Sequence, residues 1–459
     1  MTLRIWSKRA AQGLLGLVLL ATAAWATSRL LGPTDAQEAA LATMRELPPL
    51  EGDNAFGALW LMPYGLSESE LARVLAEDLR RLAATASNRG EKTDPATHHV
   101  SSAEGRFRKQ SPSAEDMALF CGGGRDCLPV VEADLERYSA LVERHAGIIK
   151  RAEALSEYSM IRHPRSAGLL DTVIPQYQHA KLPATRYAVD FAEGRRYDAF
   201  DGTCRGIDTW RRLGANSDTL ITRLIGIAYS ADIYGRLFVE MLVRTPRDFE
   251  LPLSCRQAFV PPSADELSMC RAMRGELLFL ASVTRQLEAG DGEGMSTLER
   301  TLMPVLFSAE MTEAERAEHL VFYCTEEAKR AMGADQRIVR IEAEADLFRF
   351  ECLGNPVGCV LSSVANPSFD HYNGRIQDAN ARLRLIAMLI RLRGDTGDQR
   401  PFKVQLRSAA AEVGGSEREI SIGPDGRSLR ILNYDALRGE YWEIPLPAYF
   451  QTPETAVSR

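Results

Sequence analysis

The longest run of hydrophobic positions lies near the start of the chain. Residues 10–26 carry no charged side chain, with Arg4, Lys8 and Arg9 before them and Arg29 after them. Basic residues ahead of an apolar segment keep the N-terminus in the cytoplasm. The pattern therefore predicts a bacterial-type export signal, with the rest of the chain outside the cytoplasm.

Two outcomes for this segment stay open. The run is close to the lower limit of about 17 residues for a membrane-spanning helix. Ala24-Trp25-Ala26 has the small-x-small form that signal peptidase accepts, whereas residues 27–31 continue the apolar character. The pattern favours an uncleaved inner-membrane anchor with a periplasmic body, and the alternative is a cleaved signal and a secreted periplasmic protein. The next most apolar stretch, residues 220–243, holds four charges that would be costly in lipid.

Beyond the first segment, apolar positions recur at helical spacing. Ser67 with Glu70, and Ser263 with Glu266, form capping-box patterns at predicted helix starts. Predicted helices cover residues 34–47, 67–82, 129–152, 185–213, 218–243, 263–287, 311–332 and 376–390. The segment at 218–243 is apolar around most of its circumference, which predicts a central buried helix.

The pattern changes to alternation near the C-terminus. Residues 419–422 and 427–431 alternate polar with apolar positions around Gly423-Pro424-Asp425-Gly426, which predicts a β-hairpin. The predicted fold is mainly α, a multi-helix body of helical hairpins with a small C-terminal β-hairpin. The predicted regions are a signal anchor or signal peptide (1–32), an N-terminal helical region with a long polar loop (33–130), a main helical domain (131–400) and a β-containing segment (401–459).

One stretch carries a resemblance. Residues 192–199 read Ala-Glu-Gly-Arg-Arg-Tyr-Asp-Ala and continue through Trp210-Arg211-Arg212-Leu213 to the apolar residues 219–228. This stretch resembles large, signal-anchored, mostly helical bacterial envelope proteins of unknown function, whose C-termini also carry an apolar helix and a short hairpin with a Pro-Asp-Gly type turn. The resemblance implies a fold class and an envelope location, and it brings no catalytic residues.

The same spacing is typical of a tetratricopeptide-like helical hairpin, in which Gly allows a tight turn and Ala allows close packing. No period of about 34 residues recurs, so a lone hairpin is favoured over a repeat array.

Composition excludes some classes of protein. With 459 residues and 45% hydrophobic content the chain can bury a large core. A net charge of −7 with scattered arginines favours neither nucleic acid binding nor a groove for acidic ligands, and we expect no nucleic acid partner. Eight cysteines in an oxidising compartment predict disulfides. Proximity in sequence suggests Cys121 with Cys127, Cys352 with Cys359 and Cys255 with Cys270, which leaves Cys204 for Cys324; eight cysteines allow 105 arrangements.

Candidate chemistry is sparse. His98-His99, His145 and the i,i+4 pair Glu315 and His319 match no metal motif, and we predict no metal or cofactor. The glycines between Cys121 and Cys127 offer amides to an anion, but a phosphate-loop ending is missing and a structural disulfide is favoured. Glu276 lies among apolar neighbours, where a raised pKa suits an acid catalyst, although a helix position beside Arg274 explains it equally well.

We therefore expect a non-catalytic interaction or scaffold protein of the envelope that binds another envelope protein. It would contact the inner membrane through its N-terminal segment. The alternative is a hydrolase of cell-wall or other envelope polymers, with acids such as Glu276 in a helical cleft.

Overall fold

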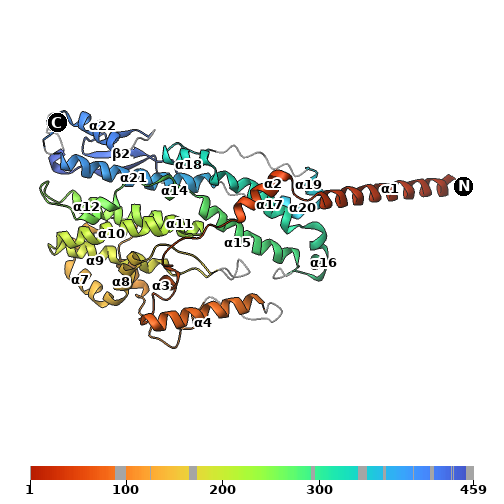
Figure 1. Cartoon of the computed structure of the whole chain (residues 1–459), viewed down its shortest axis with the longest axis horizontal. Coiled ribbons are helices and arrows are strands. Elements are labelled where there is room, and N and C mark those ends of the chain that lie inside the picture. Colours follow the sequence, from red (N-terminus) through yellow and green to blue (C-terminus); the bar gives the residue numbers. More distant parts are fainter. Residues whose placement is uncertain are drawn as a thin grey trace.

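The chain folds into a helical body from which a long helix projects (Figure 1). The computed structural model describes residues 2–87, 100–124, 126–164, 173–290, 295–339, 349–364, 369–395, 397–413, 418–435, 437 and 439–450. These residues are mostly helical, with a small antiparallel sheet near the C-terminus, so the predicted fold class is confirmed. The projecting helix is α1 (Thr2–Leu31), of which Gln12–Leu31 is long and apolar enough to cross a membrane.

One long helix, α4, several short helices and a long connection form the first part of the body. They are α2 (Asp35–Arg45), α3 (Phe56–Trp60), α4 (Glu68–Ser87), α5 (Ala114–Leu119), α6 (Leu128–Ala133), α7 (Leu135–Arg144), α8 (Ala146–Glu153) and the 3-10 helices η2 (Ala154–Glu157) and η4 (Tyr177–Lys181). The capping box ahead of α4 forms as predicted, because Ser67 N donates to Glu70 Oε2 at 2.8 Å and Glu70 N donates to Ser67 Oγ at 3.4 Å.

The single helix predicted over residues 129–152 is wrong. The backbone leaves helical geometry at Asp134 (φ −147°, ψ 59°) and at His145 (φ −107°, ψ 15°), which divides the segment into α6, α7 and α8. Val131, Tyr138 and Ile149 of the predicted apolar seam are nevertheless buried. Apolar periodicity specifies which side of a segment packs, and it does not specify whether the backbone runs straight.

The centre of the body is a set of closely packed helices. They are α9 (Leu182–Ala192), α10 (Arg196–Ala215), α11 (Leu220–Ile227), the π-helix η5 (Ala228–Tyr234) and α12 (Gly235–Leu242). The hairpin predicted from residues 192–199 joins α9 to α10, and Gly194 makes the turn at φ +90°. The single helix predicted over residues 185–213 is therefore wrong. Gly214 and Gly226 let α10 and α11 touch, because a Cβ built on Gly226 would lie 2.6 Å from Gly214 Cα.

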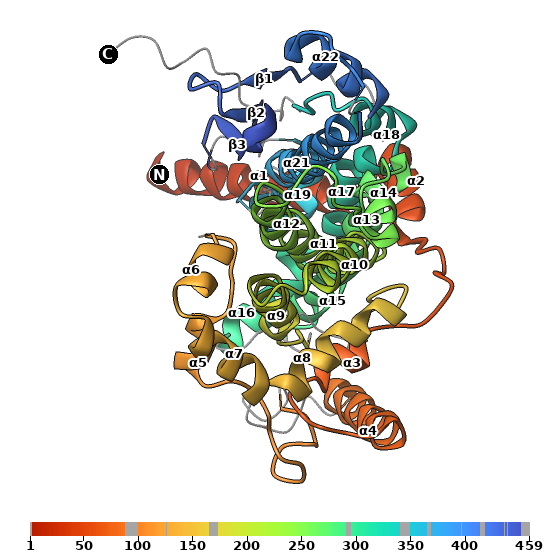
Figure 2. The same ribbon diagram turned by 90° about the vertical axis from the view of Figure 1, so that its left-hand side faces the viewer.

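Further helices surround this centre (Figure 2). They are α13 (Leu253–Ala258), α14 (Ala264–Leu267), α15 (Cys270–Glu288), α16 (Thr297–Leu306), α17 (Ala309–Leu320), η6 (Val321–Cys324, 3-10), α18 (Glu326–Gly333), α19 (Glu351–Gly354), α20 (Pro356–Val364), α21 (Asp370–Gly394) and α22 (Phe402–Glu412). The helix predicted from Ser263 is broken between α14 and α15. Its capping box is half formed, since Glu266 N donates to Ser263 Oγ at 3.1 Å while the Glu266 carboxylate binds Arg211 at 2.9 Å.

The sheet has three strands in the order β1 (Ile420–Ile422), β2 (Ser428–Leu432) and β3 (Tyr441–Pro445), followed by η8 (Ala448–Phe450). The predicted hairpin forms, with Ile420 opposite Ile431, and β3 adds a strand that the sequence pattern did not reveal. Leu429 and Trp442 of the sheet share one apolar cluster with Leu389 of α21 and with the central helices. The C-terminal segment therefore packs into the same core as the main helices.

Four disulfides bond all eight cysteines. Cys121–Cys127 and Cys352–Cys359 form as expected. The other two expected pairs are wrong, because the bonds are Cys204–Cys255 and Cys270–Cys324. The reason is packing: α13 lies against α10, which brings Cys255 to Cys204, and α15 lies against η6, which brings Cys270 to Cys324.

Candidate functional site

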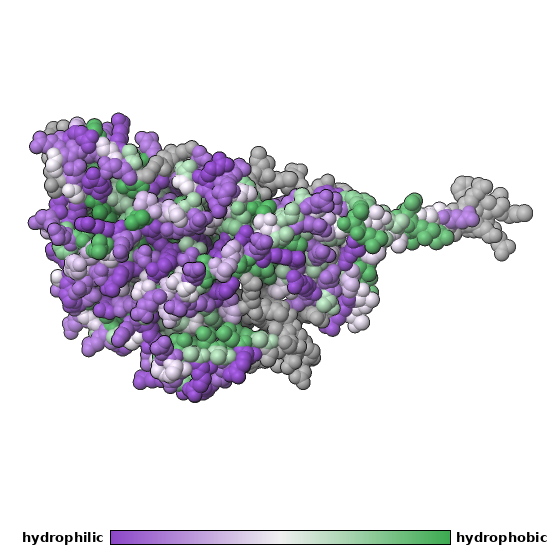
Figure 3. All heavy atoms as spheres, viewed as in Figure 1, coloured by the Kyte–Doolittle hydropathy of each residue, from purple (hydrophilic) through white to green (hydrophobic). Residues whose placement is uncertain are grey.

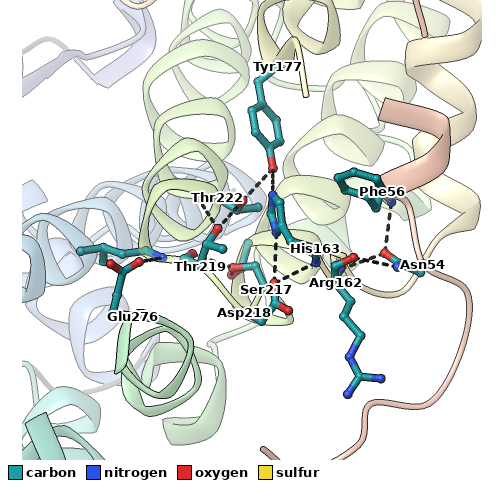
Figure 4. Close-up of polar contacts among 12 residues, drawn as sticks. Asn54, Phe56, Arg162, His163, Tyr177, Ser217, Asp218, Thr219, Thr222 and Glu276 are labelled. Atoms are coloured by element: carbon teal, nitrogen blue, oxygen red, sulfur yellow. Dashed lines mark hydrogen bonds and ion pairs between the residues drawn. The ribbon is translucent and has the colours of Figure 1, made fainter. Parts of the chain in front are cut away.

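A buried histidine joins distant segments in the middle of the body (Figure 4). His163 Nδ1 lies 3.1 Å from Asp218 Oδ1, and the His163 backbone N–H donates to the same oxygen at 3.1 Å. His163 Nε2 lies 3.3 Å from the Tyr177 hydroxyl. The three side chains are buried and come from separate parts of the chain, so folding assembles them and no spacing motif could have predicted them.

Asp218, His163 and Tyr177 follow the carboxylate–imidazole–hydroxyl order of a catalytic triad. The tyrosine hydroxyl is nevertheless poorly suited to act as a nucleophile. Burial raises the pKa of Tyr177 well above its ordinary value, which disfavours the nucleophilic phenolate. The same hydroxyl lies 2.6 Å from Thr222 Oγ1, to which Thr219 Oγ1 donates at 2.8 Å. The hydrogen-bond chain ties His163 and η4 to the start of α11.

Asn54 extends this tie to the N-terminal region. Its Oδ1 accepts from the backbone N–H groups of Arg162 at 2.8 Å and Phe56 at 3.1 Å, and its Nδ2 donates to Arg162 O at 2.9 Å. The Phe56 ring packs edge-on against the imidazole of His163, with 5.6 Å between ring centroids. The N-terminal region thus covers one side of the histidine, which is consistent with a structural role.

Glu276, the acid singled out in the sequence, caps a helix. Its Oε1 accepts from Leu220 N at 3.0 Å, the first backbone amide of α11 (Figure 4). A carboxylate at a helix N-terminus satisfies a free amide and interacts favourably with the helix dipole. Burial raises the pKa of Glu276, as the sequence suggested, but its bound oxygen faces protein backbone.

The other candidates also contact their own chain. His145 Nε2 lies 2.8 Å from Asp116, a hydrogen bond that lowers the pKa of this carboxyl, and Phe120 packs edge-on against the ring. Glu315 forms an ion pair with Arg349. His98 and His99 lie outside the described residues.

The end of the Cys121–Cys127 loop and the first residue of α6 bind the carboxylate of Glu240. Cys127 N donates to Glu240 Oε1 at 3.1 Å and Leu128 N donates to Glu240 Oε2 at 2.6 Å. Burial raises the pKa of Glu240 while the two amides oppose that shift. The disulfide therefore closes a loop whose end is capped from α12.

An acidic cleft of about 400 Å³ lies between α8, η2, α9 and α10. The carboxylates that line it are Glu153, Glu157, Asp190, Asp198 and Asp201. Arginines neutralise part of this charge, since Arg186 lies 2.8 Å from Glu153 and 3.6 Å from Asp190, and Arg205 lies 2.5 Å from Asp201. Burial raises the pKa of Glu153, and Arg186 opposes that shift.

A larger groove of about 600 Å³ runs between α22 and β1. Its lining includes Leu406, Ala410 and Ala411 from α22 and the buried arginines Arg384 and Arg418. Exposed Lys403 and Arg407 stand one helical turn apart on its rim. Sequence reasoning missed this groove, although the i,i+4 spacing of the two cations on one helix face was a usable signal.

The wall of the groove is a sheet edge. Gly423 N donates to Ser428 O at 2.9 Å, so these two residues form a hydrogen-bonded pair. Hydrogen-bonded and non-hydrogen-bonded pairs alternate along an antiparallel ladder, so the next hydrogen-bonded pair is Ser421 with Arg430. The backbone groups of Ile420 and Ile422 therefore point away from β2, toward the side where a further strand would add.

No group of three or more His, Cys, Asp or Glu side chains that would hold a metal occurs among the described residues. Searches against known protein families, curated proteins and solved structures find no match to this chain.

Proposed function

We propose that this chain is a membrane-anchored, non-catalytic interaction or scaffold protein of the bacterial envelope, with its body in the periplasm. The apolar helix α1 near the N-terminus and the four disulfides support the location, since disulfides persist in oxidising compartments. The groove between α22 and β1 is the observation that carries the binding function. Its proposed occupant is an extended, acidic segment of another envelope protein.

Each part of the groove suits such a segment. The outward backbone groups of Ile420 and Ile422 would pair with the main chain of an added strand, a common mode of peptide recognition. Small side chains at Ala410 and Ala411 leave room for the segment, and Lys403 and Arg407 favour acidic side chains on it.

Photo-crosslinking in cells tests this function. With a photoreactive residue in place of exposed Glu419, which lines the groove, we expect the full chain to crosslink to one defined envelope protein. Adding Ile422→Pro removes a backbone N–H that points away from β2 and leaves the hydrogen bonds between β1 and β2 in place. We expect about tenfold less crosslinked product, because one hydrogen bond to the bound segment is lost and its acceptor stays unpaired. Ile422→Val keeps the N–H and should preserve the product.

Two results would overturn the proposal. One is a crosslink that Ile422→Pro leaves unchanged while circular dichroism shows both variants folded. The other is the same product from a photoreactive residue at exposed Glu136 of α7, which lies on a different helix.

The acidic cleft between α8 and α10 favours the alternative, an envelope-directed hydrolase. Glu153 would be its acid, because burial raises the pKa of that carboxyl. We rank it second because Arg186 binds both oxygens of Glu153, at 3.0 and 2.8 Å. Turnover of a cell-wall polymer by the purified chain, lost in Glu153→Gln, would replace the first proposal with this one.

A further inference from the structure

Helix α16 carries an apolar stripe that faces away from the body. Leu298, Leu302, Val305 and Leu306 are 68, 41, 44 and 38% exposed, and no residue of α16 is buried. At 3.6 residues per turn these four side chains lie within about 100° of the helix circumference. Arg300 lies on the other side, where its backbone packs against Gly290 at the end of α15.

The stripe lies at the foot of α1. Trp25 Nε1 donates to Val305 O at 3.0 Å, and Arg29 donates to Pro304 O at 3.0 Å and to Phe307 O at 2.7 Å. Figure 1 places α16, α19 and α20 at the end of the body where α1 leaves it, and Figure 3 shows hydrophobic side chains at that junction.

Helices α19 and α20 add to the stripe. Ser28 Oγ accepts from Gly354 N at 3.0 Å, which fixes α19 against α1. Phe350, just before α19, Leu353 of α19, and Val360 and Leu361 of α20 are 43, 49, 48 and 39% exposed, and α20 packs against α16. We refer to these exposed apolar side chains together as the collar: Leu298, Leu302, Val305, Leu306, Phe350, Leu353, Val360 and Leu361.

The contact with Trp25 sets the depth of the collar. Trp25 lies inside Gln12–Leu31, the segment apolar enough to span, and tryptophan favours the boundary between lipid and water. A group hydrogen-bonded to Trp25 lies at the same depth. We propose that the collar inserts into the periplasmic leaflet of the bilayer that holds α1, so that the body is seated on the membrane. This inference rests on the membrane anchoring in the proposed function.

An amphipathic helix lying in the boundary region buries its apolar face in the acyl chains. Insertion of α16 would remove the exposed leucines from water, and the polar side at Arg300 would stay toward the body.

Site-specific labelling of the full chain tests the collar. The eight native cysteines are all disulfide-bonded, so one added cysteine gives a unique thiol. Leu302→Cys, Arg300→Cys, Leu20→Cys and Leu437→Cys would each carry the environment-sensitive dye NBD, in chains reconstituted into phosphatidylethanolamine–phosphatidylglycerol vesicles. Lipids with a nitroxide on the acyl chain supply the quencher.

We expect the Leu302 label to emit at shorter wavelength and to be quenched at least about twofold more than the matched Arg300 label, because only the stripe enters lipid. The Leu437 label, at a position 80% exposed, should not be quenched. Quenching of the Leu20 label reports the anchor itself.

The outcomes separate the two proposals. An unquenched Leu20 label would refute the anchoring. A quenched Leu20 label with equal, weak quenching at Leu302 and Arg300 would refute the collar alone. A shifted Leu302 label that lipid nitroxides do not quench, together with disulfide crosslinking between copies of the unlabelled Leu302→Cys chain, would assign the stripe to a second copy of this chain and would also refute the collar.

Discussion

At the residue scale, a buried charge network holds the C-terminal sheet to the helices. Asp335 ends α18 in the left-handed conformation (φ +56°), with Asp335 N donating to Met332 O and Gln336 N to Ala331 O, the Schellman pattern. That geometry points its carboxylate at Arg418, which also binds Asp378 at 2.5 Å. Burial opposes the charge on Arg418, but the two aspartates outweigh it and raise the pKa of the guanidinium.

We expect Arg418→Met to lower the free energy of unfolding by about 3–5 kcal/mol, because it removes the buried guanidinium that binds the buried carboxylates of Asp335 and Asp378. Urea unfolding followed by circular dichroism measures the loss, and hydrogen exchange of residues 420–445 shows whether the sheet opens first. Arg427→Met, at an exposed position of the same hairpin, is the control and should change stability by less than about 0.5 kcal/mol. Equal losses in the two variants would refute the role given to the network.

At the element scale, local signals predicted the elements that local chemistry determines. The turn at Gly423-Pro424-Asp425-Gly426 needs only its own residues, and so does the helix hairpin at Gly194. The breaks at Asp134 and His145, the strand β3 and the cysteine pairing depend on which helices pack together, and periodicity holds no such information. The His163 cluster was missed for the same reason, whereas the two cations on the rim of the groove at β1 carried a local signal in their i,i+4 spacing.

The disulfides allow a direct check of this packing. Non-reducing peptide mass mapping of the envelope-purified chain should find Cys204 linked to Cys255 and Cys270 linked to Cys324. Each of these bonds spans more than 50 residues, whereas Cys121–Cys127 spans 6. Replacing Cys204 and Cys255 by alanine should therefore cost about 4 kcal/mol against about 2 kcal/mol for the Cys121 and Cys127 pair. A peptide linking Cys255 to Cys270 would show that α13 and α15 pack differently.

At the scale of the whole molecule, α1 and the sheet lie at opposite ends of the body's long axis (Figure 1). An anchor and collar at one end would direct the groove between α22 and β1 away from the membrane. A body seated in this way would present the groove in a fixed direction, which would suit the proposed role of holding a partner at a set distance from the bilayer.

A body seated on the membrane through the collar requires that α1 stays attached to it. The contacts of α1 with the body therefore help to decide whether α1 is an uncleaved anchor or a cleaved signal peptide. The helix runs through Ala24-Trp25-Ala26 without a break, and all three residues are partly buried against the body. Cleavage after Ala26 would remove the Trp25 contact with Val305.

We therefore expect the chain purified from membranes to have the mass of a chain that retains residues 2–26. We also expect a reporter fused to the C-terminus to be active only in an exported form. Trp25→Ala should leave the chain in the membrane fraction, because the apolar run persists, but should weaken lipid quenching of the Leu302 label. A measured mass that corresponds to a chain beginning at Thr27 would contradict the anchor. Reporter activity in the cytoplasm would contradict the proposed periplasmic location of the body.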